Sequence, residues 1–238
     1  VPDGFAVPFA FYDGFMRHNG LYDAAQQMLA APGFATDANA REKALAKLRK
    51  QIEKAPMPAE LQTAIDKVQA VFATGLAIRC RSSTNNEDLP GFSGAGLYDS
   101  YTHKPDEGSL AATIRKVFAS VWNFRAFEER EFYRVDHLAT AMGVVLLPSY
   151  RGERANGVAV TDDIAYQTDG RRFYVNAQVG DDLVTNPEAS SIPEERLLHP
   201  SKPALDTLIR RSNRVAAGTD LLLWPALTVA CVVGSLRV

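Results

Sequence analysis

The feature that most constrains the fold is a strand-like run that leads into a long polar and glycine-rich segment. Residues 76–81, with the sequence LAIRCR, are typical of a short strand, and a polar turn is expected over residues 82–86. Arg79 and Arg81 are two positions apart, so a strand places both side chains on the same face of its sheet. The sequence therefore predicts a sheet with two permanent positive charges on one face.

Three glycines follow the turn, at Gly91, Gly94 and Gly96. Glycine allows the backbone to approach a ligand closely. Arginines, hydroxyl groups and exposed amides together suit a polyphosphate, which needs charge pairing and several N–H donors. The spacing of the glycines matches neither the P-loop nor the dinucleotide pattern. Two plainer interpretations stay open: an ordinary surface loop, or arginines that pair with Glu87 and Asp88.

The rest of the chain predicts an α+β (mixed α/β) fold, because its helices and strands do not alternate regularly. An extended piece precedes the first helix. Helices are expected over residues 8–18, 21–31, 38–54 and 59–74, then from a cap at Asp106 or Ser109 through 121, and over 126–139. Strands are expected over residues 97–102, 142–147, 157–160 and 173–179. This order favours a mixed sheet with helical additions over a doubly wound parallel sheet.

Composition excludes several classes of protein. A net charge of −2 over 238 residues gives no broad attraction to nucleic acid or to an anionic membrane. Cys80 and Cys231 lack the spacing of a disulfide framework or a metal site, so both are expected to be buried free thiols. Residues 221–236 are strongly apolar but shorter than the roughly 20 residues of a spanning helix. We expect a buried element or an atypical tail there.

One long motif in this chain resembles a known family. The matching pieces are Arg81-Ser82-Ser83, Glu87 to Gly91, Gly96 and Asp99-Ser100-Tyr101. They resemble the pattern R-S-S-x-x-x-E-D-L-P-x-x-S-x-A-G-x-x-D-T-Y of the ATP-binding domain of pyruvate phosphate dikinase and phosphoenolpyruvate synthase. Further similar stretches lie at residues 1–5, 117–126, 156–159 and 180–184. The resemblance runs from residue 1 to about residue 188.

The resemblance implies an ATP-grasp-like nucleotide-binding domain, here apparently truncated at both ends. Its parts are expected to be a helical section over 1–75, a mixed-sheet nucleotide-binding section over 76–200 and an atypical tail over 201–238. By resemblance, Arg81 contacts the transferred phosphates and is the catalytic residue. The other residues implied to bind the nucleotide are Gly94 and Gly96 in a phosphate-covering loop, Ser100 where the family has Thr, and Leu146, Leu147 and Pro148 against adenine.

Several family features have no counterpart in the sequence. The Lys of the family's G-G-K-G segment would precede residue 1, and its Glu-containing and Q-x-R-P strands are not found. The family implies ATP and Mg²⁺ as cofactors, yet no metal ligand is predicted in this chain, with Asp182 as the nearest candidate. The four histidines are expected to be ordinary residues rather than phosphocarriers, and His137 has no visible partner in its charged stretch.

The resemblance thus predicts the ATP-binding domain of a phosphoenolpyruvate synthase or pyruvate phosphate dikinase-like phosphotransferase. Its expected partners are ATP and, in a longer polypeptide, phosphohistidine and pyruvate/PEP-binding domains, in the cytoplasm and without nucleic acid or membrane. The alternative is a degenerate, non-catalytic nucleotide-binding or interaction module from a gene fragment. An altered reading frame is a further explanation for the tail, which has no acidic residue from 221 to 238.

Overall fold

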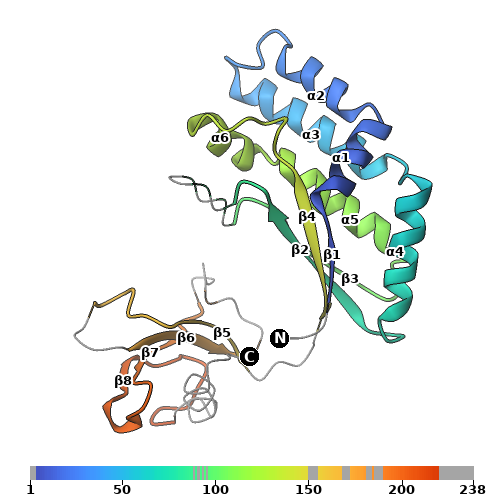
Figure 1. Cartoon of the computed structure of the whole chain (residues 1–238). Helices are drawn as coiled ribbons and strands as arrows, with labels where there is room; N and C mark the ends of the chain where they lie inside the picture. Colours follow the sequence, from blue (N-terminus) through green and yellow to red (C-terminus); the bar gives the residue numbers. More distant parts are fainter. Residues whose placement is uncertain are drawn as a thin grey trace. The chain divides into compact units, whose positions relative to one another are not determined.

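The computed structural model describes residues 4–87, 89, 92, 94, 96–149, 155–167, 172–180, 184 and 190–219. They belong to two compact units, one within residues 2–149 and the other within 150–238 (Figure 1).

The sheet of the first unit has four antiparallel strands in the order β1-β4-β2-β3. These are β1 (Phe5–Val7), β2 (Ala77–Thr84), β3 (Tyr101–His103) and β4 (Met142–Ser149). The expected mixed sheet is therefore wrong for the described strands, because every pairing among them is antiparallel. The strand expected over 97–102 does not begin until Tyr101.

Strand β2 is longer than the sequence predicts. A polar turn was expected to begin at Ser82, but β2 continues to Thr84, and Ser82, Ser83 and Thr84 pair with the first residues of β4. Three hydroxyl side chains in a row favour a turn on local grounds. Here the neighbouring strand overrides this preference by pairing with the backbone.

Six α-helices and one 3₁₀ helix are described in the first unit. They are α1 (Phe9–His18), α2 (Leu21–Leu29), α3 (Ala38–Lys54), α4 (Ala59–Val71), α5 (Leu110–Ala119), η1 (Ser120–Trp122) and α6 (Phe124–Phe132). Capping fixes two starts: Asp37 accepts from the amides of Asn39 and Ala40, and Ser109 accepts from that of Ala111. The sequence predicted a cap at Asp106 or Ser109, and the structure has it at Ser109.

The helix expected over 126–139 is wrong in both bounds. Helix α6 begins at Phe124 and ends at Phe132, and Arg134 then adopts a left-handed backbone with φ of 57°. The Val135 amide returns to the Arg130 carbonyl at 2.8 Å, which closes the helix end. The residues after this turn can therefore fold back beside α6 instead of extending it.

One face of the first sheet forms the core with the helices. Ile78, Cys80, Val144 and Leu146 belong to one buried cluster together with residues of α1, α3 and α5 (Figure 1). Burial raises the pKa of the Cys80 thiol to about 12, so this cysteine is the buried free thiol that was expected. Cys231 lies outside the described residues.

The second unit contains a four-stranded antiparallel sheet in the order β5-β6-β7-β8. Its elements are β5 (Ala155–Val160), β6 (Phe173–Val179), β7 (Glu194–Leu198), β8 (Thr207–Arg210) and the 3₁₀ helix η2 (Pro203–Leu205). The sequence predicted β5 and β6. It missed β7, because Glu194 and Arg196 are charged and yet buried, and they pair with each other at 2.6 Å.

None of the helices in the described ranges is long and apolar enough to cross a membrane. The apolar stretch at residues 221–236 lies outside those ranges.

Phe118 is the side chain whose loss the core should tolerate least. Its ring is fully buried and meets Tyr12 edge-on at 5.2 Å and Phe15 at 5.6 Å. We expect Phe118→Ala to lower the free energy of unfolding by about 3–5 kcal/mol, measured by urea denaturation. Phe132→Ala is the control, since Phe132 is 79% exposed, and it should cost less than about 0.5 kcal/mol. Equal losses would contradict this account of the core.

Candidate functional site

The candidate site lies on the face of the first sheet that points away from the helical core. Side chains alternate along β2, so Arg79 and Arg81 project opposite to the buried Ile78 and Cys80. The register of β2 with β4 sets Arg79 across from Leu147 and Arg81 across from Val145. We call this face, with its two arginines, the arginine face.

The two arginines differ in how firmly they are held. The half-buried Arg79 donates from Nη1 to Thr102 Oγ1 at 3.1 Å, whereas Arg81 is exposed. Burial lowers the pKa of Arg79, and the positive charge of Arg81 adds to this effect. Two like charges thus stand side by side, and an anion bound between them would relieve their repulsion.

Within the described ranges, no carboxylate comes within ion-pair distance of Arg79 or Arg81. The suggested pairing with Glu87 is therefore not formed; the Glu87 carboxylate instead accepts a long bond of 3.4 Å from the Thr84 amide. Asp88, the other suggested partner, lies outside the described residues. Among the described residues, the charges of Arg79 and Arg81 are therefore not balanced by a carboxylate.

Ser100 lies beside the arginine strand. Its hydroxyl oxygen accepts from the Ser82 amide at 3.0 Å and is 3.2 Å from the Ser82 hydroxyl. Ser82 directly follows Arg81, so this contact joins the end of the glycine-rich segment to the strand that carries the arginines.

Gly94 and Gly96 shape the glycine-rich segment in different ways. The buried Gly94 donates its amide to the Glu87 carbonyl at 2.8 Å, and a Cβ at Gly94 would lie 3.0 Å from the Glu87 Cα. Gly96 has a φ of 75°, which disfavours residues with a side chain. These contacts fold the segment back on itself after β2. Gly91 lies outside the described residues.

The three residues expected against adenine all lie in β4, but they do not share a face. Leu146 is buried across from Cys80, and Pro148 is across from Ile78, so both belong to the face that meets the helices. Of the three, Leu147 alone shares the arginine face. An apolar contact to a base on that face can come from the Leu147 side chain.

The described residues hold no preformed cluster of metal-ligating side chains. No group of three or more His, Cys, Asp or Glu side chains among them is arranged to hold a metal ion, and Mg²⁺ prefers oxygen ligands in near-octahedral geometry. Asp181 and Asp182 lie outside the described ranges.

Comparison with known proteins agrees with the motif. The profile of the family described as "Pyruvate phosphate dikinase, AMP/ATP-binding domain" matches residues 1–192. The chain belongs to this family. The resemblance seen in the sequence is thereby confirmed.

Curated relatives carry the same family's names. The phosphoenolpyruvate synthase of Pseudomonas aeruginosa is 33% identical over 167 residues, which cover 68% of this chain and 21% of the relative. The probable phosphoenolpyruvate synthase of Methanocaldococcus jannaschii is 29% identical over 71% of the chain and 15% of the relative. The phosphoenolpyruvate synthase of Synechocystis is 28% identical over 87% of the chain and 27% of the relative. The matched part thus spans about a fifth of such relatives.

A buried polar network lies under the glycine-rich segment of this family member, and the sequence did not reveal it. Arg130 is fully buried and donates to the Tyr98 hydroxyl at 3.2 Å, the Val121 carbonyl at 2.7 Å and His137 Nδ1 at 3.2 Å. Arg130 occurs in a charged helix, where an arginine is ordinarily exposed. No sequence pattern separated it from its exposed neighbours.

His137 has two polar partners, although the sequence shows none. Its Nδ1 accepts from Arg130, and its Nε2 lies 2.9 Å from the Glu131 carboxylate and can donate to it. Its ring stacks on Phe127 with centroids 4.0 Å apart. An imidazole that accepts at Nδ1 and donates at Nε2 is neutral. Burial is the main cause that lowers the pKa of His137, and the positive charge of Arg130 also lowers it. The hydrogen bond to Glu131 raises the pKa but does not outweigh burial.

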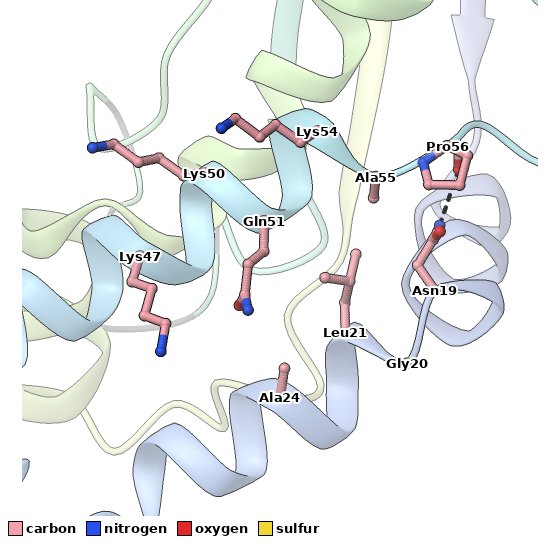
Figure 2. A pocket seen from close by; sticks show the side chains of 10 residues that line it. All are labelled: Asn19, Gly20, Leu21, Ala24, Lys47, Lys50, Gln51, Lys54, Ala55 and Pro56. Carbon is pink, nitrogen blue, oxygen red and sulfur yellow. Dashed lines mark hydrogen bonds between the residues drawn. The ribbon is translucent and has the colours of Figure 1, made fainter.

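A hollow of about 510 Å³ lies elsewhere, between the α1–α2 turn and α3 (Figure 2). Its ten lining residues include Lys47, Lys50 and Lys54 but no carboxylate. Figure 2 shows Gln51 and Leu21 pointing into it, whereas Lys50 and Lys54 extend away. Ammonium groups that do not converge cannot clamp one phosphate group, so this hollow is not arranged as a phosphate site.

The state of His137 predicts how stability depends on pH. Its pKa in the folded protein is below the ordinary 6.5, so the unfolded chain binds the proton more readily. Its contribution to stability is full above that ordinary pKa and is lost as the pH falls below it. We expect the free energy of unfolding to drop from pH 7.5 to pH 5.5.

His137→Gln is the matched variant, because a glutamine can accept and donate hydrogen bonds without titrating. Urea denaturation at both pH values should show a smaller drop for the variant than for the parent. An equal drop in both proteins would show that other groups carry the pH dependence.

Proposed function

We propose that the arginine face binds the phosphates of ATP, with Arg81 as the principal contact, in an ATP-grasp-like domain that serves phosphoryl transfer. The observation that carries this proposal is the pair of guanidinium groups that have no carboxylate partner among the described residues and share one face of the sheet. The family's description as an AMP/ATP-binding domain supports it.

Each part of the face suits one part of the nucleotide. An exposed guanidinium such as that of Arg81 can form two parallel hydrogen bonds to a phosphate group. Arg79, held by Thr102, adds a second positive charge. Leu147 offers an apolar surface across from Arg79, and Gly94 and Gly96 bring the backbone of their segment close to the end of β2.

The rest of the reaction is proposed on family grounds. The relatives are named phosphoenolpyruvate synthases, and we propose a phosphotransferase of that type, which uses ATP with Mg²⁺ and acts with phosphohistidine and pyruvate/PEP-binding domains. Binding of the phosphates is the step that we assign to the described residues, among which no group of three or more His, Cys, Asp or Glu side chains is arranged for a metal ion. The buried free thiol of Cys80 fits a reducing compartment such as the cytoplasm.

A degenerate binding module is the second candidate. Leu147 stands where the family often has Gln, so a side-chain hydrogen bond to the base is lost. The described residues also hold no acidic cluster for a metal. The lost base contact favours a domain that keeps the fold but binds nucleotide weakly.

Calorimetry with ATP in the presence of Mg²⁺ tests the proposal. We expect Arg81→Ala to weaken binding by roughly 1.5–3 kcal/mol, because a charge-assisted hydrogen bond to phosphate is lost. Arg81→Lys keeps the charge but not the paired donors, so its loss should be smaller. Lys67→Ala, which removes an exposed cation from α4, is the control and should bind like the parent.

The outcomes separate the two candidates. Binding by the parent that falls in Arg81→Ala and not in Lys67→Ala would support the phosphate site. No detectable binding by the parent would favour the degenerate module. Equal losses in Arg81→Ala and Lys67→Ala would show that overall charge, rather than the arginine face, drives binding.

A further inference from the structure

The two ends of the glycine-rich segment, residues 86–100, are joined inside the protein by side chains. Asn86 lies at its start and Tyr98 near its end, and both are buried. The Tyr98 hydroxyl donates to Asn86 Oδ1 at 3.2 Å and accepts from Arg130 Nη1 at 3.2 Å. Asn86 Nδ2 donates in turn to Thr140 Oγ1 at 3.1 Å. The segment is thus tied to α6 and to the chain before β4.

These bonds form a relay that runs in one direction. It passes from Arg130 to Tyr98, Asn86 and Thr140, and ends where the Thr140 hydroxyl donates to the Asp136 carbonyl at 2.9 Å. Hydrogen bonds in series polarise and strengthen one another, and a charged donor at the head adds to this effect. The relay therefore holds the base of the segment more firmly than isolated bonds would.

The cation at the head of the relay has no opposite charge beside it among the residues that the structure describes. Arg130 is 0% exposed, and its acceptors are a hydroxyl, a carbonyl and an imidazole. No carboxylate in the described ranges pairs with it. An arginine keeps its charge in proteins, and burying a charge without an ionic partner is costly. Arg130 is held here by three hydrogen bonds to neutral acceptors rather than by an ionic partner among the described residues.

Tyr98 also connects the relay to the arginine face. Its carbonyl accepts a long bond of 3.5 Å from the Ser82 hydroxyl, and Ser82 is bonded to Ser100 as well. Ser82 follows Arg81 in β2. A shift of Tyr98 would therefore move both the glycine-rich segment and the strand position next to the proposed phosphate contact.

We propose that Tyr98 and Arg130 are positioning residues, which hold the glycine-rich segment and Arg81 in the arrangement that receives the phosphates of the nucleotide. The proposal rests on the proposed ATP-binding function. Neither side chain needs to touch the ligand, because both act through Asn86, Ser82 and the backbone of the segment.

Tyr98→Phe is the sharpest variant. Replacing Arg130 would leave three buried acceptors without a donor and endanger folding. Tyr98→Phe removes one oxygen, keeps the ring and breaks the relay between Arg130 and Asn86. Tyr12→Phe is the matched control, since Tyr12 is also buried and its hydroxyl accepts from Trp122 Nε1 at 3.3 Å, within the helical core.

Calorimetry with ATP and with inorganic tripolyphosphate, both with Mg²⁺, should be combined with thermal unfolding. We expect Tyr98→Phe to bind both ligands roughly tenfold more weakly than the parent, while Tyr12→Phe binds them normally. Both variants should lower the melting temperature by similar amounts. Hydrogen exchange without ligand should be faster at the Gly94 amide in Tyr98→Phe and unchanged there in Tyr12→Phe.

Three results would overturn the positioning role. Parent-like affinity in Tyr98→Phe would show that the relay does not matter for binding. Equal losses of affinity in the two variants would show a general effect of stability. If the parent bound neither ligand, the proposed function would fail together with this role, and the exchange of Gly94 would still show whether the relay holds the segment.

Discussion

The pairing of β2 with β4 is the interaction on which the rest of the first unit depends. Eight residue pairs, from Ala77 with Ser149 to Thr84 with Met142, fix the register of the two strands. This register sorts the side chains of β2: Ile78 and Cys80 enter the core, and the two arginines face the other way. A slip of one residue would exchange the two sets, which would bury two cations. The core and the candidate site are therefore specified by the same backbone hydrogen bonds.

Much of this arrangement could be predicted from the sequence, because periodicity reports which face of an element is buried. The stripe of apolar residues from Leu110 to Val121 predicted α5, and the alternation around Cys80 predicted β2 and the common direction of its arginines. The resemblance of residues 81–101 to a family motif predicted the family, which the comparison confirmed. These signals are local, so they survive without knowledge of the tertiary structure.

The remaining features depend on contacts between distant residues. Strand β7 carries Glu194 and Arg196 in buried positions, which a pattern of apolar residues cannot show. The end of α6 is set by the left-handed turn at Arg134, a residue type that does not signal a helix end. Arg130 is buried because acceptors from three other segments converge on it. The roles of Arg81, Leu147 and the glycines stay predictions, because they concern contacts with a ligand.

The position of Cys80 has a practical consequence. Its thiol lies between Arg79 and Arg81 in sequence, on the opposite face of the same strand, and is 0% exposed. Thiol reagents react with the exposed thiolate, and burial raises the pKa of this thiol to about 12. Labelling at Cys80, distinguished from Cys231 by peptide mapping, will therefore record the moments when the arginine strand separates from the core. The strand thus carries its own chemical probe of local unfolding, a reporter that needs no added chromophore and no substitution.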